Sequence, residues 1–482
     1  MARWDIEDID GLIFSDGWRA GAGGVQPIVS PGDGGVVAQA GLADESDVER
    51  AGASAVAAQS TWGRTSYRTR SDVLMGAAAA LREIRTDVEH VLIRESGSLP
   101  GKARHEVDKA IDELVAAAGL VTMSQGDLLP VEDPGTIGMA RRIPVGVVGV
   151  ISPWNAPLML AIRSVAPAIA LGNAVLLKPD IKTAFSGGAA IAEVFRRAGL
   201  PDGVLHVLPG GPATGEAVVR SPHTSVISFT GSSTAGRRVG EVAGGLLKRV
   251  VLELGGNNAF VVMADADLDR AVAAGVAGSF RHQGQICMAT GRHLVHESIA
   301  DEYVERLRAA AAALVPGDPL APGTTLGPLI TAAQTERVHG IVQAAVADGA
   351  RVVHGGVHDG LFYEPTVLDG VDEGNAAFRS EIFGPVAPVT RFRTEEEALA
   401  LANASDYGLT AAIHTRDVAR ALGFAARLRA GMVAVNGQTI YDAAHIPMGG
   451  IGASGNGGRH GGHWNLDEFT YWQWVTVPTI SG

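Results

Sequence analysis

Apolar residues recur at helical spacing over much of the first quarter of the chain. They follow a segment rich in Gly, Pro and Val, residues 18–41, which has strand-and-turn character. The spacing predicts amphipathic helices over residues 44–62, 67–96 and 103–123. Asp44 or Ser46 is suited to cap the first helix, and a turn-rich stretch at residues 126–134 ends the helical region.

Short β-rich runs and helices alternate in the middle of the chain. Two such runs, residues 137–143 and 145–151, are separated by Pro144. Further strands are predicted at residues 174–178, 203–208, 225–229 and 249–253. Helices are predicted between them at residues 184–197, 213–220 and 235–243. This order is typical of a parallel sheet covered by helices on both faces.

A second α/β series is predicted after residue 287. Its expected helices are residues 298–314, 331–347, 395–402 and 416–428, and its expected strands are 386–392, 409–414 and 432–436. The break near Gly255-Gly256 is the predicted domain boundary. An aromatic and β-branched strand, residues 469–477, follows a glycine-rich stretch, and a detached terminal strand of this kind often pairs outside its own core.

Composition narrows the class of protein. A chain of 482 residues should hold two or three domains. Its formal charge of −13 argues against nucleic acid as the main partner. One cysteine excludes a disulfide framework and suggests a reducing interior. The first residues lack an apolar signal core and no apolar run reaches the ~18 residues of a bilayer span. We therefore expect a soluble, cytoplasmic protein with no membrane partner and no metal site.

The single cysteine, Cys287, lies just beyond a predicted helix at residues 272–280. Gly284 and Gly291 flank it, and glycines at such positions allow a turn that brings a side chain up to a ligand. A lone thiol forms no disulfide within its own chain. Its remaining uses are packing as a small buried hydrophobe and reactivity as a thiolate.

Two segments at the ends of predicted strands could hold a ligand, because ligands of open α/β sheets lie at the carboxyl ends of strands. Lys178 ends one strand and is placed for a ribose or a phosphate, although an ordinary exposed lysine fits the pattern too. The turn Phe229-Thr230-Gly231-Ser232 opens a helix whose free N–H groups could face a phosphate. A plain strand-to-helix turn is the alternative.

Two further polar residues could take part in chemistry. Glu253 lies inside an apolar run, where burial raises the pKa of a carboxyl toward the range of a general base. A salt-bridged structural glutamate is the alternative. Asn155 lies between Pro153 and Pro157 in a stiff loop, and its amide could donate to an oxyanion. Asparagine is common in loops, so this residue alone means little.

Taken together, in this order and spacing, these segments resemble the NAD(P)-dependent aldehyde dehydrogenase superfamily over nearly the whole chain. The matching motifs are Pro153-Trp154-Asn155, Phe229-Thr230-Gly231-Ser232, Glu253-Leu254-Gly255-Gly256, Gly284-Gln285-Ile286-Cys287 and Glu381-Ile382-Phe383-Gly384-Pro385. The flanking residues His282-Gln283 and Leu177-Lys178-Pro179-Asp180 look most like the branch that acts on aromatic aldehydes, namely the benzaldehyde, salicylaldehyde and vanillin dehydrogenases.

The resemblance implies an α/β, aldehyde dehydrogenase-like fold. Residues 1–125 and 146–255 would form a Rossmann-type cofactor domain, and residues 256–455 an α/β catalytic domain. Residues 126–145 and 466–482 would form a small β oligomerisation arm. The strands of that arm would extend a neighbour's sheet, so a homodimer or homotetramer is expected.

The resemblance also implies the roles of individual residues. Cys287 would be the nucleophile, Asn155 the oxyanion donor and Glu253 the general base, and the cofactor would be NAD, with NADP possible. The positions assigned to the cofactor are Ile151, Ser152, Trp154, Lys178, Gly211, Thr230, Gly231, Ser232, Gly236, Leu254, Gln334, Glu381 and Phe383. The positions that could line an aldehyde funnel are Ala156, Leu160, Arg163, Ile286, Tyr441 and Met448.

The expected reaction is oxidation of an aldehyde to a carboxylic acid through a thiohemiacetal and a thioester on Cys287. A small Ala156 would leave room for a flat aromatic ring, and Arg163 would meet a polar ring substituent or form a surface salt bridge. Aliphatic aldehydes or semialdehydes are the alternative substrates. A CoA-acylating enzyme is disfavoured because Glu253 is retained, and a non-catalytic relative because the three catalytic residues are intact.

Two departures from the family pattern matter. Many NAD-using relatives carry an acid three residues after the lysine, whereas Ile181 stands here and Asp180 comes one residue earlier. The sequence therefore leaves room for NADP. Relatives often carry a glutamate after the arginine of the C-terminal glycine-rich segment, whereas His460 follows Arg459 here. Glu253 is then the obvious base.

Overall fold

The computed structural model describes residues 4–479. Its first large sheet has seven strands in the order β11-β10-β7-β8-β9-β1-β2. Five of them are parallel: β7 (Val147–Ile151), β8 (Ala174–Lys178), β9 (Leu205–Val207), β10 (Val226–Thr230) and β11 (Arg249–Glu253). The antiparallel edge is formed by β1 (Leu12–Phe14) and β2 (Trp18–Ala20). The predicted parallel sheet is confirmed.

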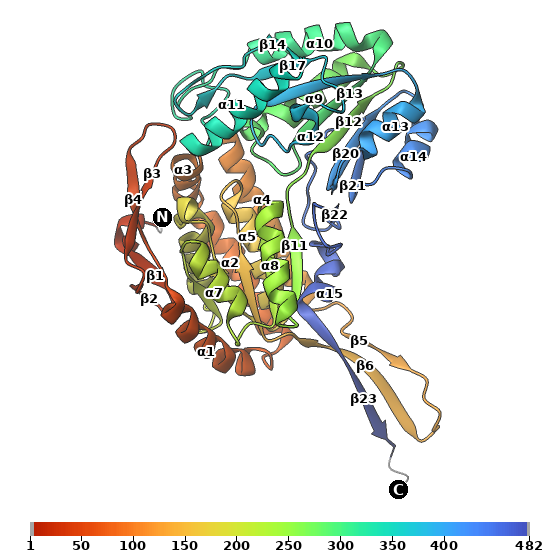
Figure 1. The fold of residues 1–482 in the computed structure, drawn as a ribbon. Coiled ribbons are helices and arrows are strands. Elements are labelled where there is room, and N and C mark those ends of the chain that lie inside the picture. The colour runs from red at the N-terminus through yellow and green to blue at the C-terminus, as the bar shows by residue number, and fades with distance from the viewer. Residues whose placement is uncertain (1–3, 480–482) are drawn as a thin grey trace.

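Helices cover both faces of this sheet (Figure 1). Successive residues of β8 alternate between the two cores: Leu176 packs with α1 and α7, and Leu177 packs with α2, α4, α5 and α6. The helices are α1 (Glu45–Trp62), α2 (Tyr67–Glu83), α3 (Arg85–Ser96), α4 (Pro100–Leu120), α5 (Pro157–Ala170), α6 (Ala190–Arg197), α7 (Pro212–Arg220) and α8 (Ser233–Gly245). Both faces of β8 are therefore buried, as its continuous apolar sequence requires.

Two helical predictions were wrong or incomplete. The single helix expected over residues 67–96 is two helices, because the chain turns at the buried Ile84 between α2 and α3. No Gly or Pro at this point marks the turn. Helix α5 was not predicted, since nearly all of its residues are buried and its apolar positions run right round the helix. Pro167 inside it also argues against a helix from sequence.

The second large sheet has seven strands in the order β14-β17-β18-β13-β12-β20-β21. They are β12 (Asn258–Val262), β13 (Thr290–His296), β14 (Arg351–His354), β17 (Thr366–Asp369), β18 (Val386–Phe392), β20 (Thr410–His414) and β21 (Met432–Val435). Its helices are α9 (Leu268–Phe280), α10 (Glu297–Ala312), α11 (Ala332–Ala347), α13 (Glu395–Asn403) and α14 (Val418–Ala425). This series begins at β12, before Cys287, rather than after it as expected.

A three-stranded sheet, in the order β23-β6-β5, extends away from the body of the protein (Figure 1). It contains β5 (Gly126–Leu129), β6 (Thr136–Pro144) and the terminal β23 (Thr470–Pro478). Apolar side chains on it are open to solvent, with Leu128 73% and Trp472 53% exposed. We refer to these three strands as the arm. Residues 1–3 and 480–482 of the predicted domains lie outside the described residues.

Shorter elements complete the fold. They are β3 (Val25–Val29), β4 (Val36–Gly41), β15 (His358–Asp359), β16 (Phe362–Tyr363), β19 (Tyr407–Gly408), β22 (Ile451–Gly452), α12 (Ala376–Arg379) and α15 (Asn465–Phe469). Within residues 4–479 no helix has the length and apolar character needed to cross a bilayer. The chain passes from the first sheet to the second between Glu253 and Asn258. That short passage brings the two sheets together around the site described next.

Candidate active site

Cys287 is presented by a tight turn that follows α9. In this turn His282 (φ 50°), Gln283 (φ 56°) and Gly284 (φ 67°) all adopt left-handed backbone conformations. A Cβ atom on Gly284 would lie 2.1 Å from the carbonyl oxygen of Gly384, so only glycine fits there. The Asn258 amide at the start of β12 donates to the carbonyl oxygen of Cys287 at 2.9 Å. These contacts fix the backbone of Cys287, and its thiol remains available to react.

The Cys287 side chain lies where two cavities meet. We call the cavity of about 270 Å³ on one side the funnel. We call the cavity of about 430 Å³ on the other side the cleft. Asn155, Leu160 and Cys287 line both cavities. A molecule in the funnel and a second molecule in the cleft can therefore meet at the sulfur.

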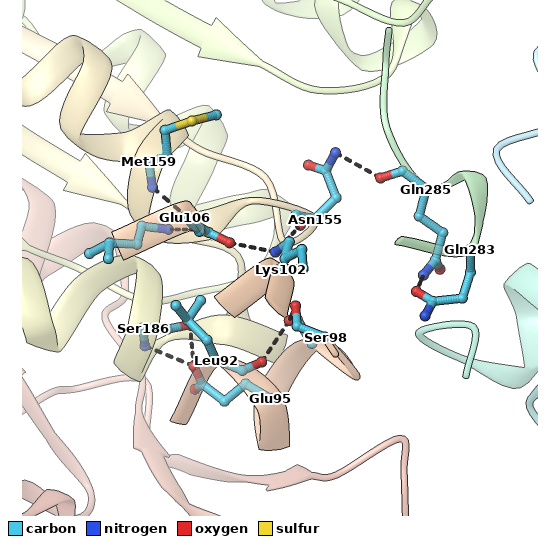
Figure 2. A network of polar contacts seen from close by, with 12 residues as sticks. Leu92, Glu95, Ser98, Lys102, Glu106, Asn155, Met159, Ser186, Gln283 and Gln285 are labelled. Atoms are coloured by element: carbon cyan, nitrogen blue, oxygen red, sulfur yellow. Dashed lines mark hydrogen bonds and ion pairs between the residues drawn. The ribbon is translucent and has the colours of Figure 1, made fainter. Parts of the chain in front are cut away.

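Asn155 lies in the loop between β7 and α5 and is 6% exposed. Its side-chain amide donates to the carbonyl oxygen of Gln285 at 2.9 Å, as Figure 2 shows. An amide nitrogen carries two hydrogens, so this bond fixes the orientation and leaves one donor for another acceptor. An oxygen bound next to Cys287 is such an acceptor. Asn155 is thus brought to the nucleophile as the resemblance implies.

Glu253 ends β11, lines the cleft and is 3% exposed. Neither of its carboxylate oxygens has a hydrogen-bond partner among the described residues. Burial raises its pKa well above the ordinary value, and the positive charges of Arg163 and Arg459 oppose that shift only in part. Burial and the nearby carboxylates of Glu381 and Glu253 likewise raise the pKa of the Cys287 thiol to about 12. A buried carboxyl without a partner is suited to exchange a proton with the sulfur or with a water molecule.

The far wall of the cleft carries Glu381 and Phe383. The Glu381 carboxylate lies against Gly255, where a Cβ atom would be 2.2 Å from it, and it accepts from the Gly256 backbone N–H at 3.0 Å. The Phe383 ring meets the Trp154 ring edge to face at 5.7 Å. Gln334 on α11 donates to the Phe383 carbonyl oxygen at 2.8 Å, so the predicted Gln334 both lines the cleft and holds this wall.

Arg337, one turn after Gln334 on α11, was not predicted. It lines the cleft, and its guanidinium donates to the carbonyl oxygens of Ile382 (2.8 Å) and Glu381 (2.6 Å). Tyr407 and Ser233 also line the cleft without having been predicted. Arg337 and Tyr407 come from separate parts of the chain and belong to no short motif, whereas Ser233 directly follows the Phe229-Thr230-Gly231-Ser232 motif. Only the folded arrangement brings them together.

The turn between β10 and α8 forms the near wall of the cleft. Thr230, Gly231, Ser232 and Leu254 line it, as predicted. The Ser232 side chain caps α8 by accepting from the backbone N–H of Ala235. Gly236 does not line the cleft, and a Cβ atom there would lie 2.3 Å from the Leu254 side chain. Its assignment to the cofactor stays a prediction, and the glycine also allows α8 to pack against Leu254.

A third cavity of about 490 Å³, which we call the groove, lies at the carboxyl ends of the strands of the first sheet. Ile151, Lys178 and Gly211 line it, as predicted. No hydrogen bond or ion pair joins the Lys178 ammonium to any residue in 4–479, and burial lowers its pKa. Ser152 does not line the groove. Its backbone N–H donates to the Lys178 carbonyl oxygen at 3.1 Å, so it fixes the strand end instead.

The loop after Lys178 also borders the groove. The Asp180 side chain accepts from the backbone N–H of Lys182 at 3.0 Å and forms an ion pair with its ammonium at 2.8 Å. Ile181 and Lys182 line the groove beside it. The Asp180 carboxylate is therefore already engaged by a cation of its own loop.

Ala156, Leu160, Ile286, Tyr441 and Met448 line the funnel, as predicted. Arg163 does not line the funnel. Both expectations for it, a contact with the substrate and a salt bridge at the surface, are corrected. Its guanidinium is buried and forms ion pairs with Glu113 at 2.8 Å and with Asp442. The bridge is internal because α5 lies between α4 and the sheet. The funnel is further lined by Lys102, His105, Met159, Arg281, Gln438, Ile440 and Asp442.

A sequence model of the aldehyde dehydrogenase family matches residues 18–475. The chain belongs to the aldehyde dehydrogenase family. It is 49% identical to a vanillin dehydrogenase of Amycolatopsis sp., over 99% of this chain and 98% of that relative. It is 48% identical to a benzaldehyde dehydrogenase [NAD(+)] of Pseudomonas putida, over 97% of this chain and 96% of that relative.

Solved structures agree with this membership of the aldehyde dehydrogenase family. The crystal structure of an NADP dependent enzyme of E. coli matches with a TM-score of 0.95 and 32% identity, covering 98% of this chain and 99% of the other. Betaine aldehyde dehydrogenase of Staphylococcus aureus in complex with NAD+ matches with a TM-score of 0.95 and 29% identity, covering 99% of this chain and 96% of the other. The fold expected from the resemblance is confirmed.

The donor set of this aldehyde dehydrogenase fits a nicotinamide dinucleotide. The groove offers an unpartnered Lys178 ammonium, and open space next to Gly211 leaves room for a ligand. The cleft offers the start of α8 at Ser232, where backbone N–H groups favour phosphate. The Glu381 carboxylate can accept from ribose hydroxyls. No group of three or more His, Cys, Asp or Glu side chains in residues 4–479 is arranged to hold a metal ion.

Proposed function

We propose that this aldehyde dehydrogenase oxidises an aromatic aldehyde to its carboxylic acid with NAD+. The observation that carries the proposal is the position of Cys287 and Asn155 at the junction of the funnel and the cleft. An aldehyde in the funnel would meet a dinucleotide in the cleft at the sulfur. The similarity to vanillin and benzaldehyde dehydrogenases supports an aromatic substrate.

The first half of the reaction uses Cys287 and Asn155. The neutral thiol loses its proton to a base, for which Glu253 is the carboxylate in the same cleft. The sulfur then attacks the aldehyde carbon, and the carbonyl oxygen becomes an oxyanion that the Asn155 amide stabilises. One such donor is typically worth ~10²–10³ in rate. Bound NAD+ supplies the acceptor for the hydride that leaves this carbon, so that a thioester remains on Cys287.

The second half of the reaction uses Glu253 again. Once Glu253 has released the thiol proton to solvent, its carboxylate removes a proton from water and the hydroxyl oxygen attacks the thioester carbon. The Cys287 thiolate then leaves and takes that second proton back from Glu253. Aldehyde and water thus give the acid, with two electrons passed to the cofactor. The unpartnered carboxylate supports this role, because no ion pair has to be broken before it accepts a proton.

The funnel supports a flat substrate. Leu160, Met159 and Met448 supply apolar surface, and Ala156 leaves space beside Cys287. Aromatic rings bury well against such side chains. Oxidation of an aliphatic aldehyde would use the same catalytic residues, and the similarity to vanillin and benzaldehyde dehydrogenases favours the aromatic substrate.

NAD+ is the proposed cofactor, and we propose that NADP+ is also accepted. The NAD-dependent benzaldehyde dehydrogenase of P. putida supports the first assignment. The ion pair between Asp180 and Lys182 supports the second, because the Asp180 carboxylate is shared with a cation and the Lys182 ammonium faces the groove. A 2′-phosphate would meet less repulsion there than beside a free carboxylate.

We also propose that the arm joins subunits into a homodimer or homotetramer. Its exposed Leu128, Trp472 and Trp474 are apolar surface that a partner would cover. Residues 126–145 and 466–482 remain the proposed oligomerisation segments. The cytoplasm remains the proposed location, in keeping with a single cysteine.

The test is a substrate panel with both cofactors. Benzaldehyde, vanillin, hexanal and succinic semialdehyde are each mixed with the protein and NAD+ or NADP+, and reduced cofactor is followed by absorbance. We expect the highest kcat/KM with an aromatic aldehyde and NAD+, and the free acid as product. A flat trace with every pair contradicts the proposal. A higher kcat/KM with an aliphatic aldehyde overturns the proposed aromatic substrate. An acyl-CoA product on adding CoA overturns the proposed hydrolysis of the thioester by water.

A further inference from the structure

Helix α5, which directly follows Asn155, begins without a cap of its own. Ala156 occupies the N-cap position and makes no side-chain hydrogen bond to the helix, and Pro157 follows it. The backbone N–H groups of Leu158 and Met159 therefore need an outside acceptor. The Glu106 carboxylate on α4 is that acceptor, at 2.9 Å from Leu158 N and 3.4 Å from Met159 N (Figure 2). A negative charge at this end of a helix is also favoured by the helix dipole.

Lys102 extends this contact to Asn155 itself. It lies one turn before Glu106 on α4 and forms a buried ion pair with that carboxylate. Its ammonium also donates to the carbonyl oxygen of Asn155 at 2.8 Å (Figure 2). Asn155 is thus held at its backbone by α4 and at its side-chain amide by Gln285 of the cysteine turn. The buried imidazole of His282, also in the cysteine turn, lies close to the Asn155 backbone as well.

Capping α5 does not by itself require the lysine. Glu106 satisfies both helix N–H groups directly, and burying an ammonium is unfavourable unless it is well paired. The second contact of Lys102, to the Asn155 carbonyl oxygen, is what the lysine adds. That contact fixes the residue whose amide must lie ~3 Å from the oxyanion. A 1 Å misplacement of a catalytic donor can cost ~10²-fold in rate.

We propose that Lys102 is a positioning residue that acts through Asn155. Resting on the proposed function, this inference assigns the Lys102–Glu106 pair to holding the oxyanion donor in place. Lys102 does not take part in chemistry itself. It also lines the funnel, so direct contact with the substrate is the competing explanation, and the experiment has to separate the two.

A double-mutant cycle separates them. Lys102→Met, Asn155→Ala and the double variant are compared with the wild type on benzaldehyde. We expect Lys102→Met to lower kcat about 10–100-fold with KM within about threefold, because oxyanion stabilisation is lost and binding is kept. In the Asn155→Ala background the same change should cost less than about twofold. A purely structural role would cost the same in both backgrounds.

Arg85→Met is the matched control. Arg85 on α3 also forms ion pairs, with Glu89 and Asp108, and donates to a carbonyl oxygen of α4, at Arg104. It does not line the funnel, so kcat should stay at the wild-type value. If Lys102→Met folds poorly because Glu106 is left charged, the variant Lys102→Met/Glu106→Gln removes both charges and keeps an oxygen for Leu158 N. The same loss of kcat is expected of it.

Several outcomes overturn the inference. They are an unchanged kcat in Lys102→Met, an equal loss in both backgrounds, wild-type activity of Asn155→Ala, and a rise in KM alone, which would indicate substrate contact. Inactive wild-type protein would instead contradict the proposed function. The crystal structure of Lys102→Met tests the positioning role independently of kinetics. We expect Asn155 to shift and the hydrogen bond from its amide to Gln285 to break. Retention of that hydrogen bond overturns the positioning role.

Discussion

The cofactor side and the substrate side of Cys287 are built in different ways. The groove and the cleft are formed largely by strand ends and the turns after them, such as Lys178 at the end of β8 and Thr230 at the end of β10. The funnel is formed by side chains from α4, α5, the cysteine turn and the segment 438–448. A short motif can encode a strand end and its turn. It cannot encode a wall assembled from four distant segments.

The largest effect should come from removing the group that both sides share. Cys287→Ala should lower kcat by on the order of 10⁴-fold or more, because no other thiol is present. Binding of NAD+, followed by quenching of tryptophan fluorescence, should be unchanged. Oxidation of benzaldehyde by this variant at more than about a hundredth of the wild-type rate would contradict the role of the sulfur.

Glu253→Gln should affect the second half of the reaction most. Water activation is lost and deprotonation of the thiol is slowed, so turnover should fall about 10²–10⁴-fold while the first hydride transfer continues at a lower rate. Stopped-flow absorbance should show a burst of NADH of about one per active site, followed by a slow steady rate. Loss of the burst would mean that Glu253 is needed mainly to deprotonate the thiol.

The same carboxyl predicts a pH dependence. Burial raises the pKa of Glu253 well above its ordinary value, and a protonated carboxyl cannot accept a proton. Turnover should therefore fall as the pH falls through that raised pKa, at a pH well above the ordinary range of a glutamate. The profile of kcat against pH is compared with that of Glu253→Gln, which should lack this acidic limb. An acidic limb that persists in Glu253→Gln would reflect the titration of another group.

The smallest effects should distinguish the substrate side of the site from the cofactor side. Ala156→Phe narrows the funnel and should raise KM for benzaldehyde about tenfold, with little change in KM for NAD+. Lys178→Met removes a donor from the groove, because its ammonium has no other partner in the described chain. This variant should raise KM for NAD+ with little change in KM for benzaldehyde. Steady-state kinetics of both variants check this. Equal changes in both KM values would mean that the two sides are not independent.

Much of the fold followed from the pattern of apolar residues. The predicted strands at residues 174–178 and 249–253 coincide with β8 and β11, because fully buried parallel strands are short continuous apolar runs. The same rule fails for α5, which is as apolar as a strand but helical. The turn at Ile84 also escaped prediction, since tertiary packing rather than a local Gly or Pro ends α2 there.

The residues of the site likewise include some that the sequence identified and some that it did not. Motif resemblance pointed to Cys287, Asn155 and Glu253, and the structure brings them to one place. It also assigned Gly236 and Ser152 to the cofactor. These two residues line neither the groove nor the cleft, so their assignment stays a prediction. A motif marks a position that matters without saying what the residue touches. Lys102 and Arg337 belong to no motif, so their contacts with the site were beyond the reach of sequence.

The single cysteine at the junction of the funnel and the cleft has a practical consequence. Each polypeptide contains one sulfhydryl, and that sulfhydryl is the proposed reactive centre. A thiol-directed reagent therefore adds at most one mass increment per molecule, and intact mass spectrometry counts the modified centres directly. The enzyme thus allows a direct titration of its own competent fraction, with no background from other sulfur nucleophiles.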